Sequence, residues 1–433
     1  MNRVASLASR GDYGQALVRL WVLAGQRTAD TSRLNAWERE RNATAFPTQV
    51  ADFRRRLQED AQLTASEIDA APLAFVTALD EALALDEESL PTFEMPFEEE
   101  GAGYWLTRIE IAFRRPVPLA RQTGNPEAGF KRHRIIPVRT SHGVEVRVTL
   151  APRRLARLLE DLIAGGSVTF RGWVGHFRDA ARLQWDTSAA GRFRLRRIHP
   201  ADARNDSIRE SLKQASECGS QVVVLPEFTV DLDGRKVVAD WMVAHPEHPF
   251  LLVVAGSFHE DTPEGCYNTA ELWNHLAEPI LVHRKLRLFG AAEGLAEDVK
   301  EGGRIEVLVS PIGTLTLLIC KDFMDGHQSV ATLLQEVPVD WVLVPSYGDE
   351  RTVKSHRARA EQLAKVGPGT SCLIANQRNV EMSPGVALPG FAMGAPDATC
   401  QDVGEEGGPV RFDVPVQSAD GPSPRHGHLK RVK

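Results

Sequence analysis

Seven short apolar runs in the second part of the chain constrain the fold more than any other feature. Each is four to seven residues long and consists mainly of Val, Ile and Leu; they lie at 222–225, 250–255, 279–282, 305–309, 314–320, 341–344 and 372–375. Such runs are typical of strands buried on both faces, so their sheets must be covered by helices or by another sheet. Helix-like stretches at 203–217 and 354–366 separate several of them, which predicts an α/β domain.

The first part of the chain has a different pattern. Apolar residues recur at helical spacing in three stretches, 12–28, 48–62 and 70–86. A Pro- and Glu-rich string at 90–103 interrupts this pattern, and alternating apolar and polar residues after it indicate exposed strands. We therefore expect three parts: a helical N-terminal domain at 1–90, a mixed α/β basic connecting region at 91–190 and the main α/β domain at 191–433.

Composition narrows the class of protein. No apolar run approaches the roughly 18 residues that cross a bilayer, and the N-terminus lacks the apolar stretch and cleavage site of a secretory signal. Five widely spaced cysteines without a C-x-x-C pair argue against a disulfide framework or a zinc site. We expect a cytoplasmic protein with reduced thiols that does not act at a membrane. The cysteines are Cys218, Cys266, Cys320, Cys372 and Cys400.

The formal charge of −7 is unevenly distributed. Residues 131–200 contain fifteen Lys or Arg against five Asp or Glu, so this stretch carries about +10 and the remainder about −17. Such a block can bind nucleic acid, but it lacks the interleaved aromatic residues of a single-strand binding surface. We favour a solvated, Arg-rich face packed against the acidic remainder and keep nucleic-acid binding as the minor alternative.

Three reactive side chains lie at the ends of predicted strands: Glu227 and Lys285 come just past two of the apolar runs, and Cys320 ends the run 314–320. Taken singly, each has an ordinary interpretation: a surface carboxylate, a solvent-facing amine and an inert small hydrophobe. However, Asp322 and Gly326 follow Cys320, which places the thiol at a strand-to-turn junction where backbone N–H groups can bind an oxyanion. A carboxylate can take the proton of a thiol, and an ammonium can stabilise negative charge on the substrate. The set therefore predicts a cysteine-hydrolase site.

The chain also resembles the carbon–nitrogen hydrolase, or nitrilase, superfamily over about residues 190–380, and to the C-terminus at the widest. The order of the three strings around Glu227, Lys285 and Cys320 matches the family pattern. Accessory segments match it too: Tyr267-Asn268-Thr269-Ala270, Pro311-Ile312-Gly313, Val344-Pro345-Ser346, Arg357-Ala358-Arg359-Ala360-Glu361 and Asn376.

This resemblance implies a four-layer-forming α-β-β-α sandwich, here with the helical N-terminal domain and the basic, partly β connecting region added. It implies that Glu227 is the general base, Cys320 the nucleophile and Lys285 the cation that holds the tetrahedral oxyanion. The family has a second glutamate before the cysteine; Glu297 fits its spacing better than Glu293. The resemblance further implies a homo-oligomer that needs no cofactor or metal.

The chain departs from the family pattern near the nucleophile. Position 321, usually aromatic or uncharged, is Lys, and the segment after Met324 lacks the usual Arg-Phe-Pro-Glu-like string. After Asn376 the expected glycine-rich strand pair is blurred. We expect these changes to affect the choice of substrate more than the fold.

Together these features predict a hydrolase that cleaves a non-peptide carbon–nitrogen bond, in an amide or a nitrile, through a thioester on Cys320. The alternative is a nitrilase-like scaffold or small-molecule sensor that works with a protein or nucleic-acid partner. The long N-terminal region and the changes around Cys320 favour this alternative. Retention of Glu227, Lys285 and Cys320 favours the enzyme.

Overall fold

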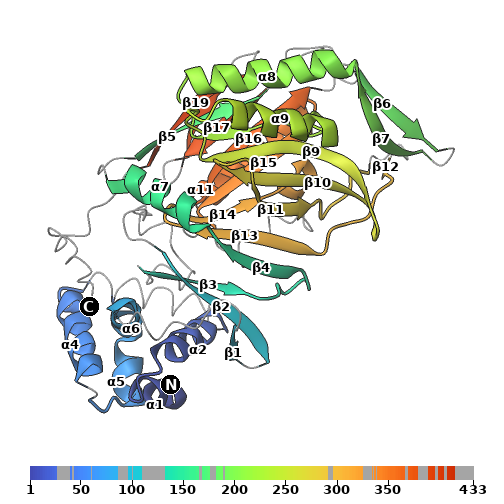
Figure 1. Cartoon of the computed structure of the whole chain (residues 1–433). Coiled ribbons are helices and arrows are strands. Elements are labelled where there is room, and N and C mark those ends of the chain that lie inside the picture. The colour runs from blue at the N-terminus through green and yellow to red at the C-terminus, as the bar shows by residue number, and fades with distance from the viewer. Residues whose placement is uncertain are drawn as a thin grey trace.

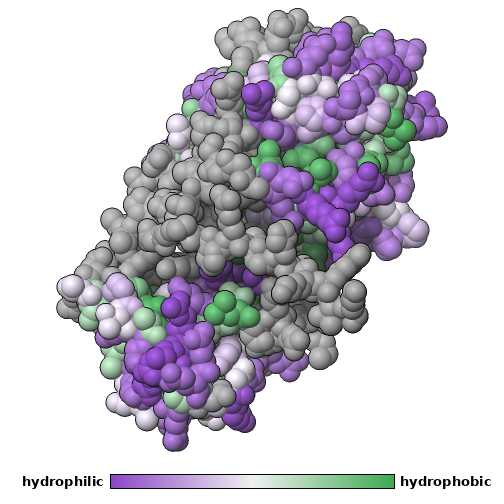
Figure 2. All heavy atoms as spheres, turned by 60° about the vertical axis from the view of Figure 1, so that its left-hand side comes forward, coloured by the Kyte–Doolittle hydropathy of each residue, from purple (hydrophilic) through white to green (hydrophobic). Residues whose placement is uncertain are grey.

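The fold consists of helices and four β-sheets, seen in a computed structural model (Figure 1). The structure describes residues 1–26, 40, 43–59, 61–85, 96–99, 101–109, 132–164, 168–175, 182–188, 191–290, 296–324, 334, 336–337, 339–365, 369–378, 389–394, 398–403 and 407–414. On the face drawn in Figure 2, the described residues are mostly hydrophilic, with smaller hydrophobic patches among them. No described helix is long and apolar enough to cross a membrane.

The first large sheet has six strands in the order β11-β10-β9-β8-β5-β19. Its centre is parallel, since β8 pairs in parallel with both β5 and β9, and the outer pairs are antiparallel. The strands are β5 (Val168–Val174), β8 (Val222–Val224), β9 (Leu252–Thr262), β10 (Gly265–Asn274), β11 (Pro279–Arg284) and β19 (Gly408–Val414).

The second large sheet has seven strands in the order β18-β17-β16-β15-β14-β13-β4. The pairs β14–β15, β15–β16 and β13–β4 are parallel, and β13–β14 is a tight antiparallel hairpin. The strands are β4 (Glu145–Leu150), β13 (Arg304–Ser310), β14 (Gly313–Leu317), β15 (Trp341–Gly348), β16 (Ser371–Arg378), β17 (Gly390–Gly394) and β18 (Thr399–Asp402).

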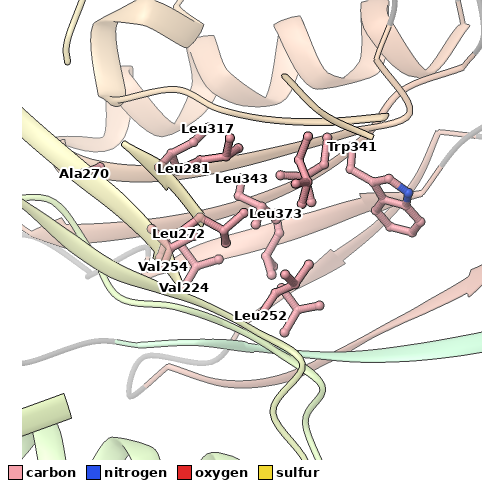
Figure 3. Close-up of a cluster of buried hydrophobic side chains, with 14 of the residues drawn as sticks. Val224, Leu252, Val254, Ala270, Leu272, Leu281, Leu317, Trp341, Leu343 and Leu373 are labelled. Atoms are coloured by element: carbon pink, nitrogen blue, oxygen red, sulfur yellow. The ribbon is translucent and has the colours of Figure 1, made fainter. Parts of the chain in front are cut away.

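The main hydrophobic core lies between these two sheets (Figure 3). Val224, Val254 and Leu272 of the six-stranded sheet and Leu343 and Leu373 of the seven-stranded sheet belong to it and are almost fully buried. Burying an aliphatic side chain of this size contributes about 1.5–3 kcal/mol. The continuous apolar runs of the sequence are therefore explained by strands that pack on both faces.

Helices cover the outer faces of the two sheets. On the six-stranded sheet, α8 (Ala201–Glu217) and α9 (Leu232–Ala244) contribute Ile208 and Val238 to a core that includes Val223 and Val253. On the seven-stranded sheet, α11 (Glu350–Lys365) buries its apolar face against residues of β15 and β16. Helix α7 (Arg153–Ala164) contributes to the core between the sheets. The expectation of a mixed α/β fold is confirmed.

The N-terminal residues form a separate group of helices, drawn in blue in Figure 1. The described residues before 86 include helices and no strand, as the periodicity predicts; the helices are α1 (Asn2–Ala8), α2 (Tyr13–Gln26), α4 (Phe46–Gln58), α5 (Ala65–Ala70) and α6 (Pro72–Leu85). They pack against a small antiparallel sheet of β1 (Phe97–Glu99), β2 (Ala102–Arg108) and β3 (His133–Pro137), with Leu79, Leu106 and Ile135 in one core.

Strands from both sides of the predicted boundary at residue 191 belong to the same sheets. Strand β4 pairs with β13, and β5 pairs with β8, so segments of the predicted connecting region are integral to both large sheets. Sequence texture missed this because the partners lie far apart in the chain. The division into a helical N-terminal domain, a connecting region and a main α/β domain stays a prediction.

The Arg-rich stretch at 131–200 is partly ion-paired with acidic residues that follow it in the chain. Arg134 lies 3.1 Å from Asp340, Arg192 lies 3.5 Å from Asp298, and Arg194 pairs with Asp261. These contacts agree with a face packed against acidic residues. Nucleic-acid binding by residues 131–200 stays an untested alternative.

Candidate active site

Four buried side chains from different strand ends form one cluster. Glu227 lies just after β8, Lys285 just after β11, and Glu297 ends the short strand β12 (Ala296–Glu297). Cys320 begins a turn of 3₁₀ helix, Cys320–Phe323, shortly after β14. Their exposed fractions are 1%, 2%, 3% and 6%, in that order. Ionisable groups are seldom buried this deeply unless they are paired or functional.

Lys285 connects the two carboxylates. Its Nζ atom lies 2.9 Å from Glu227 Oε1 and 2.9 and 3.1 Å from Glu297 Oε2 and Oε1. Asn268 Nδ2 donates to Oε1 of both glutamates, at 2.9 and 3.1 Å. Although burial alone would lower it, the pKa of Lys285 is raised because both carboxylates favour the ammonium. The lysine is therefore a fixed positive charge.

The two glutamates differ in how fully they are bonded. Both oxygens of Glu297 are engaged: Oε1 also lies 3.2 Å from His259 Nε2, and Oε2 accepts the backbone N–H of Phe289 at 2.6 Å. Glu227 uses Oε1 for its two donors, and no described residue donates a hydrogen bond to its Oε2. Glu227 thus has an oxygen with which to accept a proton.

The electrostatics follow the same division. Burial raises the pKa of Glu227; Lys285 opposes this shift and the negative charge of Glu297 reinforces it. For Glu297 burial also acts upwards, but Lys285 and His259 outweigh it and hold its pKa at about 2. Burial lowers the pKa of His259, which makes it a neutral ring at ordinary pH. Glu227 is therefore the better candidate for proton transfer.

The turn that presents Cys320 is strained. Cys320 has φ = 43°, in the left-handed region that non-glycine residues seldom adopt and that clusters at active sites. Asp322 fixes this turn: its Oδ1 accepts the backbone N–H groups of Leu286 and Arg287 at 3.0 and 2.7 Å, and its Oδ2 lies 2.9 Å from His283 Nε2. The turn that presents Cys320 is thus tied to the segment that carries Lys285.

The thiol of Cys320 lies in a dry, polarised environment. Its Sγ is 3.6 Å from the backbone oxygen of Tyr347. Burial raises its pKa to about 12; Glu227 reinforces this shift, while Lys285 and Ser346 oppose it. Ser346 Oγ is in turn 3.0 Å from His356 Nε2. A thiol in this setting is uncharged at rest, so it needs a base when it attacks.

The structure brings together the residues that the sequence singled out and adds several that it missed. Glu297 joins the cluster, whereas Glu293 lies outside the described residues. Lys321 donates from Nζ to the backbone oxygen of Leu288 at 2.9 Å. Asn268 stood in a quoted motif without a role. Ser346 likewise stood in a quoted motif without a role, and no role was expected for the other neighbours of the cluster, which are His259, His283 and His356.

Comparisons with known proteins give a likeness in structure only. No protein-family model and no curated protein matches the chain. Solved structures similar to it include an amidase from Nesterenkonia sp., at 20% identity over 58% of this chain and 91% of that one, with a TM-score of 0.41. A mutant described as a Nesterenkonia amidase from the nitrilase superfamily is 21% identical over 58% of this chain and 92% of that one, with a TM-score of 0.42. A double mutant of the Nesterenkonia amidase in complex with acrylamide is 20% identical over 62% of this chain and 94% of that one, also with a TM-score of 0.42. With such TM-scores these likenesses carry no part of the functional argument.

Proposed function

We propose that the chain is a hydrolase of non-peptide carbon–nitrogen bonds, with Cys320 as nucleophile, Glu227 as general base and Lys285 as the cation that holds the oxyanion. The observation that carries the proposal is the pairing of one ammonium with two unequal carboxylates next to a strained, buried thiol. We also propose that the two large sheets and their covering helices are the α-β-β-α sandwich that the sequence resemblance implies.

Acylation begins when Glu227 takes the proton of the Cys320 thiol as Sγ attacks the carbonyl carbon of an amide. The carbonyl oxygen becomes an oxyanion next to Lys285, whose ammonium has three N–H donors and can keep one for it. As the C–N bond breaks, Glu227 returns the proton to the leaving amine. The products are the free amine and a thioester on Cys320.

Deacylation repeats these steps with water. Glu227, again unprotonated, takes a proton from a water molecule that attacks the thioester carbon. The second oxyanion is held by Lys285 until the C–S bond breaks and the thiolate recovers the proton from Glu227. The acid then leaves, and no metal or organic cofactor enters any step. Homo-oligomer formation and a cytoplasmic location stay predictions.

Ammonia release from a panel of primary amides tests this function. We expect the native protein to hydrolyse at least one of acetamide, propanamide, benzamide and phenylacetamide, and Cys320→Ala to hydrolyse none. Intact-mass measurement of Cys320→Ser, whose ester intermediate forms slowly, reports whether position 320 is acylated. If the native protein releases no ammonia and forms no adduct from the panel or from a matching panel of nitriles, the scaffold interpretation takes precedence.

A further inference from the structure

Five aromatic side chains form a continuous wall next to the catalytic cluster. Trp185 lies at the centre, with ring centroids 5.2 Å from Phe193, 5.4 Å from Phe228 and 6.3 Å from Tyr347, all in edge-on geometry. Phe289 extends the wall, 6.0 Å from Phe193. Edge-on contacts at these separations are the preferred arrangement of aromatic rings.

The wall meets the reacting groups directly. Phe228 follows the proposed base in sequence, has φ = 60°, and its ring centroid lies 6.0 Å from Lys285 Nζ. The backbone oxygen of Tyr347 is the atom 3.6 Å from Cys320 Sγ. A substrate whose carbonyl carbon reaches Cys320 therefore lies close to the ring of Phe228, and the ring of Tyr347 adjoins that ring, with centroids 5.5 Å apart.

The wall is only partly closed by the protein itself. Phe228 is buried, with 4% exposed, whereas the other members of the wall are only partly buried. Aromatic rings that are held against one another and still open to solvent leave apolar surface available to a ligand. Those partly buried members are Trp185, Phe193, Phe289 and Tyr347.

A separate element of the fold positions the outer part of the wall. Trp185 and Phe193 belong to the hairpin of β6 (Arg182–Thr187) and β7 (Arg192–His199), which forms a three-stranded sheet with β12 and extends away from the two large sheets at the upper right of Figure 1. The register of the hairpin shifts between Gln184 and Trp185. Such bulges re-aim a side chain and are frequent next to active sites.

We propose that this aromatic wall binds an aromatic ring of the substrate, so that the substrates are amides in which an aryl group lies close to the scissile carbonyl. The proposal rests on the proposed function, because the wall is placed by its contacts with Glu227, Lys285 and Cys320. A flat apolar ring can pack edge-on against Trp185 and Phe228, and its transfer from water stabilises the complex more than that of a methyl group. The aromatic wall therefore favours aryl amides over short aliphatic ones.

The test compares kcat/KM for phenylacetamide and acetamide, measured as ammonia release. We expect the native protein to prefer phenylacetamide by at least about tenfold. Trp185→Ala should reduce this ratio by about tenfold, mainly through KM for phenylacetamide, and Trp185→Phe should retain most of it. The matched control is Trp241→Ala, which removes another partly buried tryptophan. Trp241 lies on α9 and stacks on His245, with ring centroids 4.3 Å apart. The ratio of kcat/KM for phenylacetamide to that for acetamide should equal the native ratio in this variant.

The outcomes separate this proposal from the one on which it rests. Hydrolysis of acetamide without a preference for phenylacetamide would overturn the aryl proposal and leave the hydrolase function standing. An equal loss of both activities in Trp185→Ala, with a native selectivity ratio, would show that the wall only supports the fold. Failure of the native protein to act on any amide or nitrile of the two panels would instead overturn the function itself. Thermal unfolding of each variant confirms that the rates come from folded protein.

Discussion

Two regions of the molecule bury charged groups, and they do so differently. In the N-terminal region, Asp80 of α6 lies 2.9 Å from His133 of β3, and its second oxygen accepts the backbone N–H of Arg132 at 2.7 Å. Each carboxylate oxygen of Asp80 has a partner, and the pair joins a helix to a sheet. In the part built from the two large sheets, Glu227 keeps Oε2 without a described donor, close to the strained turn of Cys320.

The number of hydrogen bonds that each carboxylate oxygen accepts indicates what role a buried carboxylate has. When every oxygen is satisfied, as in Asp80 and Glu297, the group holds its neighbours in place. When an oxygen is left open in a dry site, the carboxylate retains a place for a proton, which is a property of a general base. Substitutions in the two regions test whether open and fully bonded carboxylates differ in this way.

The largest expected effect comes from Lys285→Ala, which leaves two carboxylates buried together without a cation. Removing one partner of a buried ion pair costs about 3–5 kcal/mol of unfolding free energy, and loss of the oxyanion donor should lower turnover about a hundredfold to a thousandfold. Urea unfolding and ammonia release measure the two effects. Adding Glu297→Gln should restore part of the stability but none of the turnover; restored turnover would show that Lys285 serves the fold only.

Glu227→Gln should lower turnover by about a hundredfold to ten-thousandfold, because the amide cannot accept the thiol proton. Its unfolding free energy should change little, since the Gln side-chain oxygen can still accept from Asn268 and Lys285. Steady-state kinetics and urea unfolding of the same preparations give both values. Near-native turnover in this variant would contradict the assignment of the base.

Asp80→Asn should have the opposite profile. Replacing the satisfied carboxylate weakens its contacts with His133 and Arg132, which should lower the unfolding free energy by about 1–3 kcal/mol. Turnover of the folded fraction should equal the native value, because Asp80 and His133 join α6 to β3 and their described hydrogen bonds involve none of Glu227, Lys285, Glu297 and Cys320. A reduced kcat at a temperature where the variant is fully folded would contradict a purely structural role for Asp80.

The pH profile gives the smallest expected effect. Activity requires unprotonated Glu227, so it falls as the pH drops through the pKa of Glu227, which burial raises above the usual 4.5. The charge of Glu297 contributes to this raised pKa, so Glu297→Gln should move the acid limb of kcat/KM to lower pH. A limb that moves to higher pH, or stays in place, would show that another group controls it.

The sequence predicted those parts of the site whose signals are local. Glu227, Lys285 and Cys320 each lie at the end of a continuous apolar run, and strand ends deliver side chains to one edge of a sheet. The pairing of β4 with β13 was not predicted, because it joins residues about 160 positions apart. His259 and Ser346 were missed for a related reason: their roles arise from contacts across strands and a helix that no local pattern records.

The burst of nitrophenolate from 4-nitrophenyl acetate measures whether Cys320 is acylated with Glu227 as the base. This activated ester reports acylation even when the preferred amide substrate is not known. We expect a burst of one equivalent of nitrophenolate per active site, and mass spectrometry should place the acetyl group on Cys320. The burst rate should fall at least about a hundredfold in Glu227→Gln. In Asp80→Asn it should equal the native rate. A native burst rate in Glu227→Gln, or an acetyl group on another residue, would contradict these roles of Cys320 and Glu227.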